Sequence, residues 1–170
     1  MKAAAPLRLV LAALLIAASG VAAAQGVEVH GENSVFAGHG VVIAWGVLRA
    51  AVEDETRVVM RIAPPGHAYA YVGVEAVDPF TRARRPVLPA EPLGETLDVR
   101  SPRTTFGDFP RREVRLYRTA EEWRAGRPAL TVYYLGVPDT APEFASEAAL
   151  LAYLAEAVAK ARPAAGRPAP

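Results

Sequence analysis

The positions of the histidines are the feature of this sequence that suggests a metal-binding site. The chain has three histidines, and His30 and His39 enclose a short polar segment that ends before a long apolar run. If the strands on either side of that segment pair as a hairpin, the two imidazoles lie near each other, with Glu32 between them in the loop. Two imidazoles and a carboxylate suit Zn²⁺ or Cu²⁺. The hypothesis is a metal site at His30, Glu32 and His39, with His67 as a further donor. The alternative is loop histidines and no cofactor.

A second group of chemically useful residues is the arginine-rich, proline-interrupted region after residue 80. Arg82, Arg84 and Arg85 come close together there, and arginine binds carboxylates and phosphates through paired hydrogen bonds. Tyr69 and Tyr71 precede them on a predicted strand whose odd-numbered side chains are expected to point outward. Tyrosine and arginine are favoured at recognition surfaces. The pattern predicts a binding face for a small anionic ligand or an acidic protein patch. The alternative is a solvated surface with internal ion pairs.

Nucleophilic catalysis has little support in the sequence. None of the serines lies in a G-x-S-x-G turn, and Ser146 is better explained as a helix cap. Ser34 with His39 and an acid leaves open a small exported hydrolase. Residues 53–55 are all acidic, but they fall in a predicted hairpin connection, where carboxylates ordinarily solvate a turn.

The elements that must position these residues are organised around residues 40–50, which are apolar on both alternating faces. A strand points successive side chains to opposite faces. Something must therefore cover both faces of this segment. One face carries Val41, Ile43, Trp45 and Val47, and the other carries Val42, Ala44 and Leu48.

Shorter segments with alternating apolar residues surround this central strand. We predict further strands at 27–30, 56–63, 69–77, 96–100, 112–118 and 129–135. Thr119 and Glu122 match a capping box, which predicts a short helix near 120–125. Ser146 begins a run of strong helix formers, with Leu150, Leu151, Leu154 and Val158 on one face. About seven strands with these two helices predict a mainly β chain folded as an antiparallel β-sandwich.

The two ends of the chain differ in character from its middle. Residues 1–24 have a charged start, an apolar run and small residues at the end, which predicts a secretory signal peptide cleaved after Ala24. The mature protein would then be periplasmic or secreted. Residues 25–160 are expected to form a single domain. Residues 161–170 contain only Ala, Pro, Gly and Arg, and we expect a disordered tail.

Charge and cysteine content limit the functions available. Without residues 1–24, which carry two of the 19 basic side chains, 17 basic side chains face 18 acidic ones. A nearly neutral chain argues against a general binder of nucleic acid or of anionic membranes, and we expect no stable membrane insertion after cleavage. There is no cysteine, so the domain must be stabilised without disulfides.

Three hypotheses of function follow from these observations. The first is an exported binding or accessory module, without catalytic activity, that binds an envelope protein or a small anionic ligand at the Arg82, Arg84, Arg85, Tyr69 and Tyr71 face. The second is a periplasmic metal-binding protein that uses His30 and His39. The third is the small exported hydrolase. The oligomeric state stays open.

Overall fold

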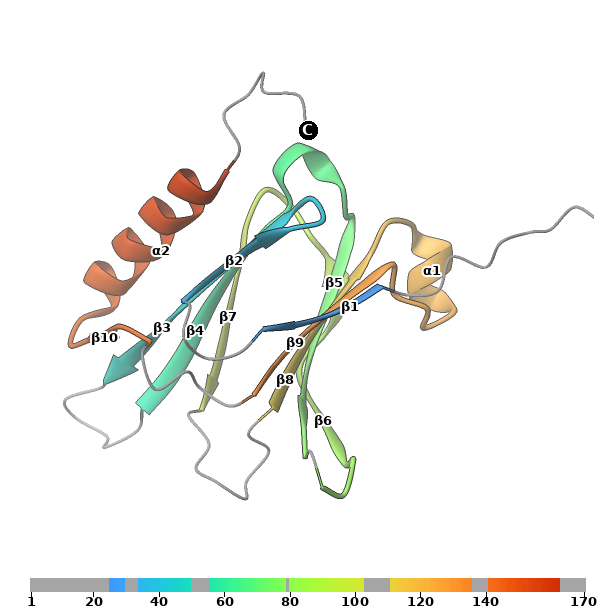
Figure 1. The fold of residues 1–170 in the computed structure, drawn as a ribbon, viewed down its shortest axis with the longest axis horizontal. Helices are drawn as coiled ribbons and strands as arrows, with labels where there is room; N and C mark the ends of the chain where they lie inside the picture. The colour runs from blue at the N-terminus through green and yellow to red at the C-terminus, as the bar shows by residue number, and fades with distance from the viewer. Residues whose placement is uncertain are drawn as a thin grey trace, which may run out of the picture.

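The computed structural model describes residues 25–29, 34–49, 56–78, 80–102, 111–135 and 141–162. Within them the chain forms ten strands, two α-helices and one turn of 3-10 helix. The strands divide into two sheets, as Figure 1 shows. The prediction of a mainly β sandwich with one short helix and a C-terminal helix is confirmed.

Sheet A has five strands in the spatial order β1-β9-β8-β5-β6. Strands β9, β8, β5 and β6 are antiparallel neighbours, and β1 is added at the edge in parallel to β9. Their bounds are β1 Gln25–Val29, β5 Tyr71–Val77, β6 Arg84–Pro92, β8 Arg111–Tyr117 and β9 Leu130–Leu135.

Sheet B is built on β3 (Val41–Arg49), the predicted central strand. Strand β4 (Thr56–Ala63) pairs antiparallel with β3, and β7 (Leu97–Pro102) pairs antiparallel with β4. The other edge of β3 is shared by two short strands. Strand β2 (Val35–Gly38) runs antiparallel along residues 41–44, and β10 (Glu143–Phe144) runs parallel along residues 47–48. The edge of β3 opposite β4 is therefore completed by two segments, β2 and β10, that are far apart in the sequence.

The main core lies between the two sheets. Alternate side chains of β3 and β4 face alternate side chains of β5, β8 and β9, and Trp45, Met60 and Leu116 are among the largest that are fully buried. The strands predicted at 56–63 and 112–118 are confirmed as β4 and β8. This one cluster joins both sheets.

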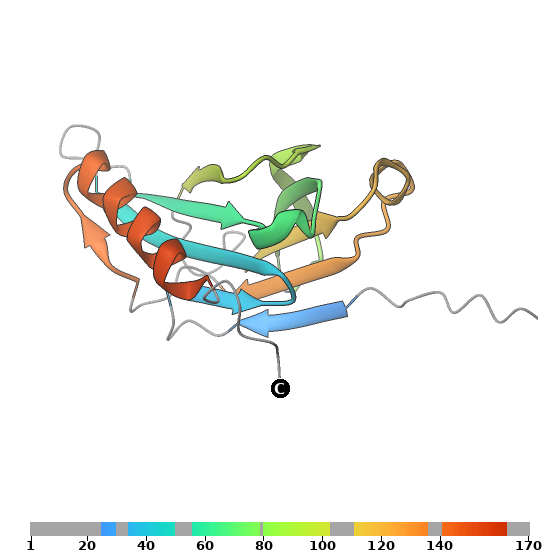
Figure 2. The same ribbon diagram turned by 90° about the horizontal axis from the view of Figure 1, so that it is seen from above.

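A second core lies on the opposite face of sheet B, under α2 (Glu147–Ala161). Leu150, Leu154 and Val158 of this helix pack on Val42 and Ala44 of β3. Figures 1 and 2 show α2 running along sheet B, on the side away from sheet A. Strand β3 is thus covered on both faces, as its sequence requires.

Both helices begin at the residues that the sequence indicates. The Thr119 hydroxyl accepts a hydrogen bond from the Glu122 backbone N–H at the start of α1 (Ala120–Arg124). The Glu122 carboxylate accepts in turn from the backbone N–H of Arg118, one residue before the cap. Ser146 caps α2 by accepting from the N–H of Ala149. The predicted caps are confirmed.

The hairpin that was expected to join the first strand to the central strand is wrong. Strand β1 belongs to sheet A, and it is β2, from a segment expected to be a turn, that pairs with β3. The connection between β2 and β3 is the two-residue turn His39-Gly40, with φ of 52° and 78°. A type I′ hairpin turn requires positive φ angles at both of its central residues, and glycine adopts a positive φ without steric strain.

Gly46 is the residue of β3 that allows α2 to lie close to the sheet. A Cβ atom at Gly46 would lie 2.6 Å from Cδ1 of Leu150 and 3.4 Å from the carbonyl oxygen of Pro142. Any side chain here would push against the fully buried Leu150. The second core therefore depends on a position without a side chain.

We expect Gly46→Val to lower the free energy of unfolding by about 1–3 kcal/mol, because it overpacks the contact between β3 and α2. Urea titration of Gly46→Val, of Leu150→Ala and of the double variant measures the coupling energy between the two positions. Valine should fill part of the space that Leu150→Ala leaves, so the double variant should lose at least about 0.5 kcal/mol less than the sum of the singles. Strict additivity would contradict the contact.

Candidate functional site

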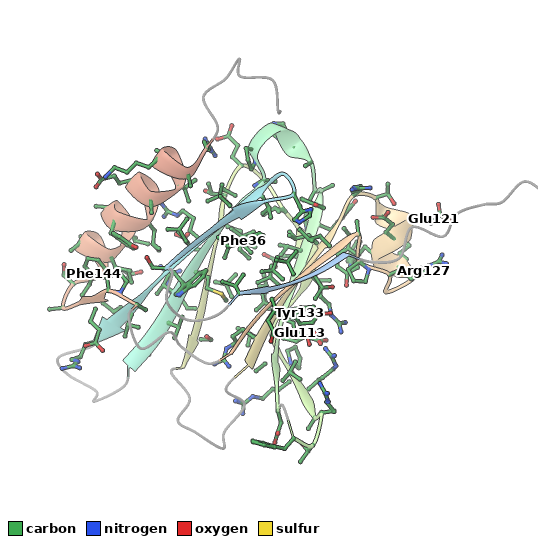
Figure 3. All side chains as sticks on the ribbon, in the orientation of Figure 1. Phe36, Glu113, Glu121, Arg127, Tyr133 and Phe144 are labelled. Atoms are coloured by element: carbon green, nitrogen blue, oxygen red, sulfur yellow. The ribbon has the colours of Figure 1, made fainter. Side chains whose placement is uncertain are left out.

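The outer face of sheet A, here called the open face, brings together most of the polar and aromatic side chains that could bind a partner. Its members follow from strand register, because directly paired residues share a face. One row across four strands is Glu75, Glu113, Tyr133 and Glu28, and the next row is Gly73, Arg115, Thr131 and Gly26. Figure 3 shows Glu113 and Tyr133 beside each other on this sheet. No helix of the described residues lies over the centre of this face.

Like charges directly opposite each other on antiparallel strands repel, and Glu75 and Glu113 are such a pair. Two arginines offset this repulsion. Nη1 of Arg84 lies 2.7 Å from Oε2 of Glu75 and 2.7 Å from Oε2 of Glu113. Nη2 of Arg115 lies 3.4 Å and 3.6 Å from the same two oxygens. The four side chains form a closed ion network across β5, β6 and β8.

The network determines what Arg84 can do. Its hydrogen bonds to Glu113 first, and to Glu75 second, raise the pKa of the Arg84 guanidinium above its ordinary value. The Glu113 side chain is only 5% exposed, whereas the Arg84 side chain is 43% exposed, so the carboxylate is shielded from water and the guanidinium only partly. The two rows named above carry, together with Arg84, three carboxylates and two guanidinium groups. Arg84 is therefore placed in an internal network, and the centre of the open face is not a cationic receptor for a small anion.

The same geometry bears on catalysis by the paired carboxylates. Both Glu75 and Glu113 are held by the same two arginines, on the broad face of a sheet and not in a cleft. A glycosidase would need one carboxyl group that is protonated and able to reach the substrate. The arrangement of these side chains is suited to holding three strands together.

The tyrosines of the prediction fall in two different environments. Strand β5 begins at Tyr71, not at Tyr69, so the expected outward orientation of Tyr69 is wrong. Tyr69 is 3% exposed, and its hydroxyl donates to the backbone oxygen of His39 at 2.8 Å. Burial is the main cause that raises the pKa of the Tyr69 phenol. Tyr71 lies on the open face, where its ring stacks on Trp123 of α1 with ring centres 4.7 Å apart.

Tyr133 contributes an aromatic side chain at the other side of the open face. A Cβ atom at Gly26 would lie 2.8 Å from Cε2 of Tyr133, so the ring lies directly over this glycine of β1. Tyr133 is half-buried. The open face therefore has a Tyr71 and Trp123 pair near α1, the ion network in the middle, and Tyr133 beside the edge strand.

The remaining arginines of the prediction lie at the turn between β5 and β6 and at the start of β6. Arg82 in the turn and Arg85 in β6 are both exposed. Arg82 has a φ of 62°, a left-handed conformation unusual for a residue other than glycine. The Asp78 carboxylate accepts from the backbone N–H groups of Phe80 at 2.8 Å and Thr81 at 3.1 Å. These bonds fix the shape of the turn.

The predicted metal ligands are only partly described. His30 and Glu32 lie outside the described residues. His39 and His67 are exposed and occupy two turns that touch, since a Cβ atom at Gly40 would lie 3.0 Å from Cβ of Ala68. In the described part of the chain no three His, Asp or Glu side chains are grouped closely enough to hold a metal ion.

The serines of the described ranges have structural partners. The Ser34 hydroxyl is hydrogen-bonded to the hydroxyl of Tyr153 on α2. The buried Ser101 accepts a long hydrogen bond, 3.5 Å, from Nε of Arg112, and Ser146 caps α2. Residues 53–55 lie outside the described residues. Nothing in the geometry of these serines favours the hydrolase.

A shallow groove of about 370 Å³ lies between β2 and α2. Its walls are mostly apolar, and an ion pair of Lys160 and Glu156, 2.6 Å apart, lies on its rim. The lining residues are Val35, Tyr153, Glu156, Ala157, Lys160 and Ala161. Because Lys160 and Glu156 neutralise each other, the groove has no net charge that would favour an anionic or a cationic ligand.

Comparisons with protein-family models, with curated proteins and with solved structures find no match for this chain. None of the described helices is long and apolar enough to cross a membrane. The function must therefore be argued from the side chains themselves.

Sequence reasoning missed three members of the open face, namely Glu113, Arg115 and Trp123, as parts of one site. Strand alternation does place Glu75, Glu113 and Arg115 on outward faces. It does not show which strands are neighbours, because β8 lies between β5 and β9 only in the folded sheet. The order of strands was the information that the pattern lacked.

We expect Glu113→Ala to lower the free energy of unfolding by about 1–3 kcal/mol, because it leaves Arg84 and Arg115 without a nearly buried partner. The matched control is Arg49→Ala. It removes an exposed ion pair with Glu143 of similar length, 2.6 Å, and should cost less than about 1 kcal/mol. Urea titration measures both. Equal losses in the two variants would show that the network contributes no more than an exposed pair.

We expect the Asp78 carboxyl group to titrate below its ordinary range. Its hydrogen bonds from Phe80 first, and from Thr81 second, lower its pKa. Because the folded pKa lies below the unfolded one, the stabilisation is present above the unfolded pKa and is lost as pH falls through the folded pKa. Carboxyl ¹³C NMR titration, with the protein in urea as the control, measures the difference. A midpoint no lower in the folded protein would show that the turn does not favour the ionised carboxylate.

Proposed function

We propose that this protein is an exported, non-catalytic accessory module that binds another envelope protein through the open face. One observation carries the proposal. Of the two outer faces of the sandwich, α2 covers that of sheet B, whereas that of sheet A carries Tyr71, Trp123, Tyr133 and Arg115. Tyrosine, tryptophan and arginine are the residue types that most often dominate protein interfaces.

The charges of the open face favour a protein partner over a small anionic ligand. Arg84 and Arg115 of this face are already bound to Glu75 and Glu113. A small anion would have to displace a carboxylate of the protein itself. A protein surface can instead contact the aromatic side chains at the two ends and leave the network intact, which avoids the cost of exposing buried charge.

Export is supported by the pattern of residues 1–24 alone. If it is correct, the mature chain begins at Gln25, which is also the first residue of β1. The mature N-terminus would then lie at the edge of the open face, since β1 is the outermost strand of sheet A. Mass measurement of the protein purified from the cell envelope tests the cleavage site.

The test of the proposed function is photo-crosslinking in the envelope, with p-benzoylphenylalanine placed at Tyr133 or at the exposed Glu28. We expect both positions to crosslink one envelope protein. The same substitution at Ala152 or Ala155, exposed on α2, should not capture it. The purified partner should then bind Tyr133→Ser at least about tenfold more weakly than the wild type, as for a hot-spot side chain. Ala155→Ser should bind unchanged.

Equal crosslinking from the open face and from α2 would contradict the proposal, as would an affinity that Tyr133→Ser leaves unchanged. Thermal unfolding of each variant establishes that it is folded before its crosslinking is compared.

A further inference from the structure

The end of the sandwich at which α2 stops carries a polar pocket of about 260 Å³. It shares no lining residue with the groove beside β2. Three segments that are distant in sequence form its walls. They are the 3-10 turn η1 (Pro65–His67) with the preceding Pro64, the turn between β6 and β7 at Glu95, and Arg162, the residue that follows α2. Figure 1 shows the turn between β4 and β5 and the end of α2 at the same end of the molecule.

The wall formed by η1 has an unusual backbone that local contacts hold in place. Gly66 and His67 have φ angles of 75° and 56°, and this left-handed conformation is uncommon for a residue other than glycine. The His67 N–H donates to the oxygen of the buried Pro64 at 3.2 Å. The Tyr69 hydroxyl, two residues further on, donates to the oxygen of His39 and so ties η1 to the turn between β2 and β3. Backbone strain of this kind is concentrated at ligand-binding sites.

The ionisable side chains of the pocket carry both signs of charge. Arg162 is cationic, Glu95 is anionic, and the imidazole of His67 is able to donate a hydrogen bond. All three are exposed, so a ligand reaches them from solvent. Within the described part of the chain, none of the three side chains forms an ion pair or a hydrogen bond. The guanidinium and the carboxylate therefore line one pocket without binding each other, unlike the charged groups of the open face.

We propose that this pocket binds a small zwitterion, namely an α-amino acid with an apolar side chain. Arg162 and His67 donate hydrogen bonds to its carboxylate, and Glu95 accepts hydrogen bonds from its ammonium group. The rings of Pro64 and Pro65 form the wall against which its side chain packs. The pocket shares no residue with the open face, so a result at one site does not decide the other.

The two charges of the pocket favour a zwitterion over a simple anion or cation. An anion bound at Arg162 would be repelled by Glu95, and a cation bound at Glu95 would be repelled by Arg162. A molecule with both charges gives each group a partner of opposite sign. A peptide terminus supplies only one of them. The volume of about 260 Å³ also lies below the range of about 300–1,000 Å³ that is usual for drug-sized ligands, which suits a single amino acid.

The test titrates the purified protein with L-alanine, L-leucine and L-phenylalanine, and follows binding by calorimetry and by NMR. We expect at least one of the three to bind at millimolar concentration and to shift the backbone signals of Gly66, His67 and Glu95. Acetylation of the amino group removes the positive charge of that amino acid, and amidation removes its negative charge. Each derivative should bind at least about tenfold more weakly, because a hydrogen bond between charged groups is lost.

Variants of the pocket assign each end of the ligand to its partner. Glu95→Gln should weaken binding of the amino acid at least about tenfold and should not weaken its N-acetyl derivative. Arg162→Gln should weaken the amino acid by a similar factor and should not weaken its amide. His67→Gly should also weaken the amino acid, and glycine suits the left-handed backbone at this position, so the turn is not strained by the change.

Matched controls change the same residue types elsewhere on the surface. Glu121 and Arg127 are exposed beside α1, on the other side of the molecule from α2 (Figure 3). Glu121→Gln and Arg127→Gln should therefore leave the affinity for the amino acid unchanged.

Three results would overturn the inference. The first is that none of the three amino acids binds. The second is that the acetylated and amidated derivatives bind as tightly as the amino acid itself, since the pocket would then not recognise both charges. The third is binding that Glu95→Gln and Arg162→Gln leave unchanged, which would place the amino acid elsewhere on the protein. Each of these results leaves the proposed function of the open face as it stands.

Discussion

The structure depends on one constraint, which is that β3 is apolar on both of its faces. A strand with such a sequence cannot lie at the surface of a sandwich unless another element covers its outer side. Helix α2 supplies that cover through Leu150, Leu154 and Val158, and Gly46 lets it approach. Because α2, the one long helix among the described residues, packs on sheet B, the outer face of sheet A must stay soluble without a helix over it.

Sheet A meets that requirement with charge. Its outer face sets Glu75 opposite Glu113, and the repulsion between them is offset by two arginines that each contact both carboxylates. The network gives the face a firm, neutral centre. The aromatic residues Tyr71, Trp123 and Tyr133 lie half-buried at its borders.

The sequence predicts most of the strands and both helices, but it does not predict which strands lie next to each other in the sheets. The periodicity of residues 41–49, the caps at Thr119 and Ser146, and the apolar face of α2 predicted the central strand and both helices, because each depends on local chemistry. The predicted hairpin between residues 27–30 and the central strand was wrong because the turn lies at His39-Gly40, and a positive φ at a histidine is not visible in sequence. Tyr69 was assigned outward because the strand was begun two residues early. The open face needed the order of strands, which no local pattern contains.

The shared edge of β3 has a consequence for the order in which the fold can form. Strands β3 and β4 are made early, whereas β10 and α2, which complete the edge and cover the outer face of β3, come from residues 143–161. During synthesis the apolar strands would remain without their cover until the chain is almost finished. We therefore expect sheet B to complete its fold only after residues 143–161 have been made. For a chain that is predicted to cross a membrane before it folds, this delay keeps it in a form that can be threaded through a translocation channel.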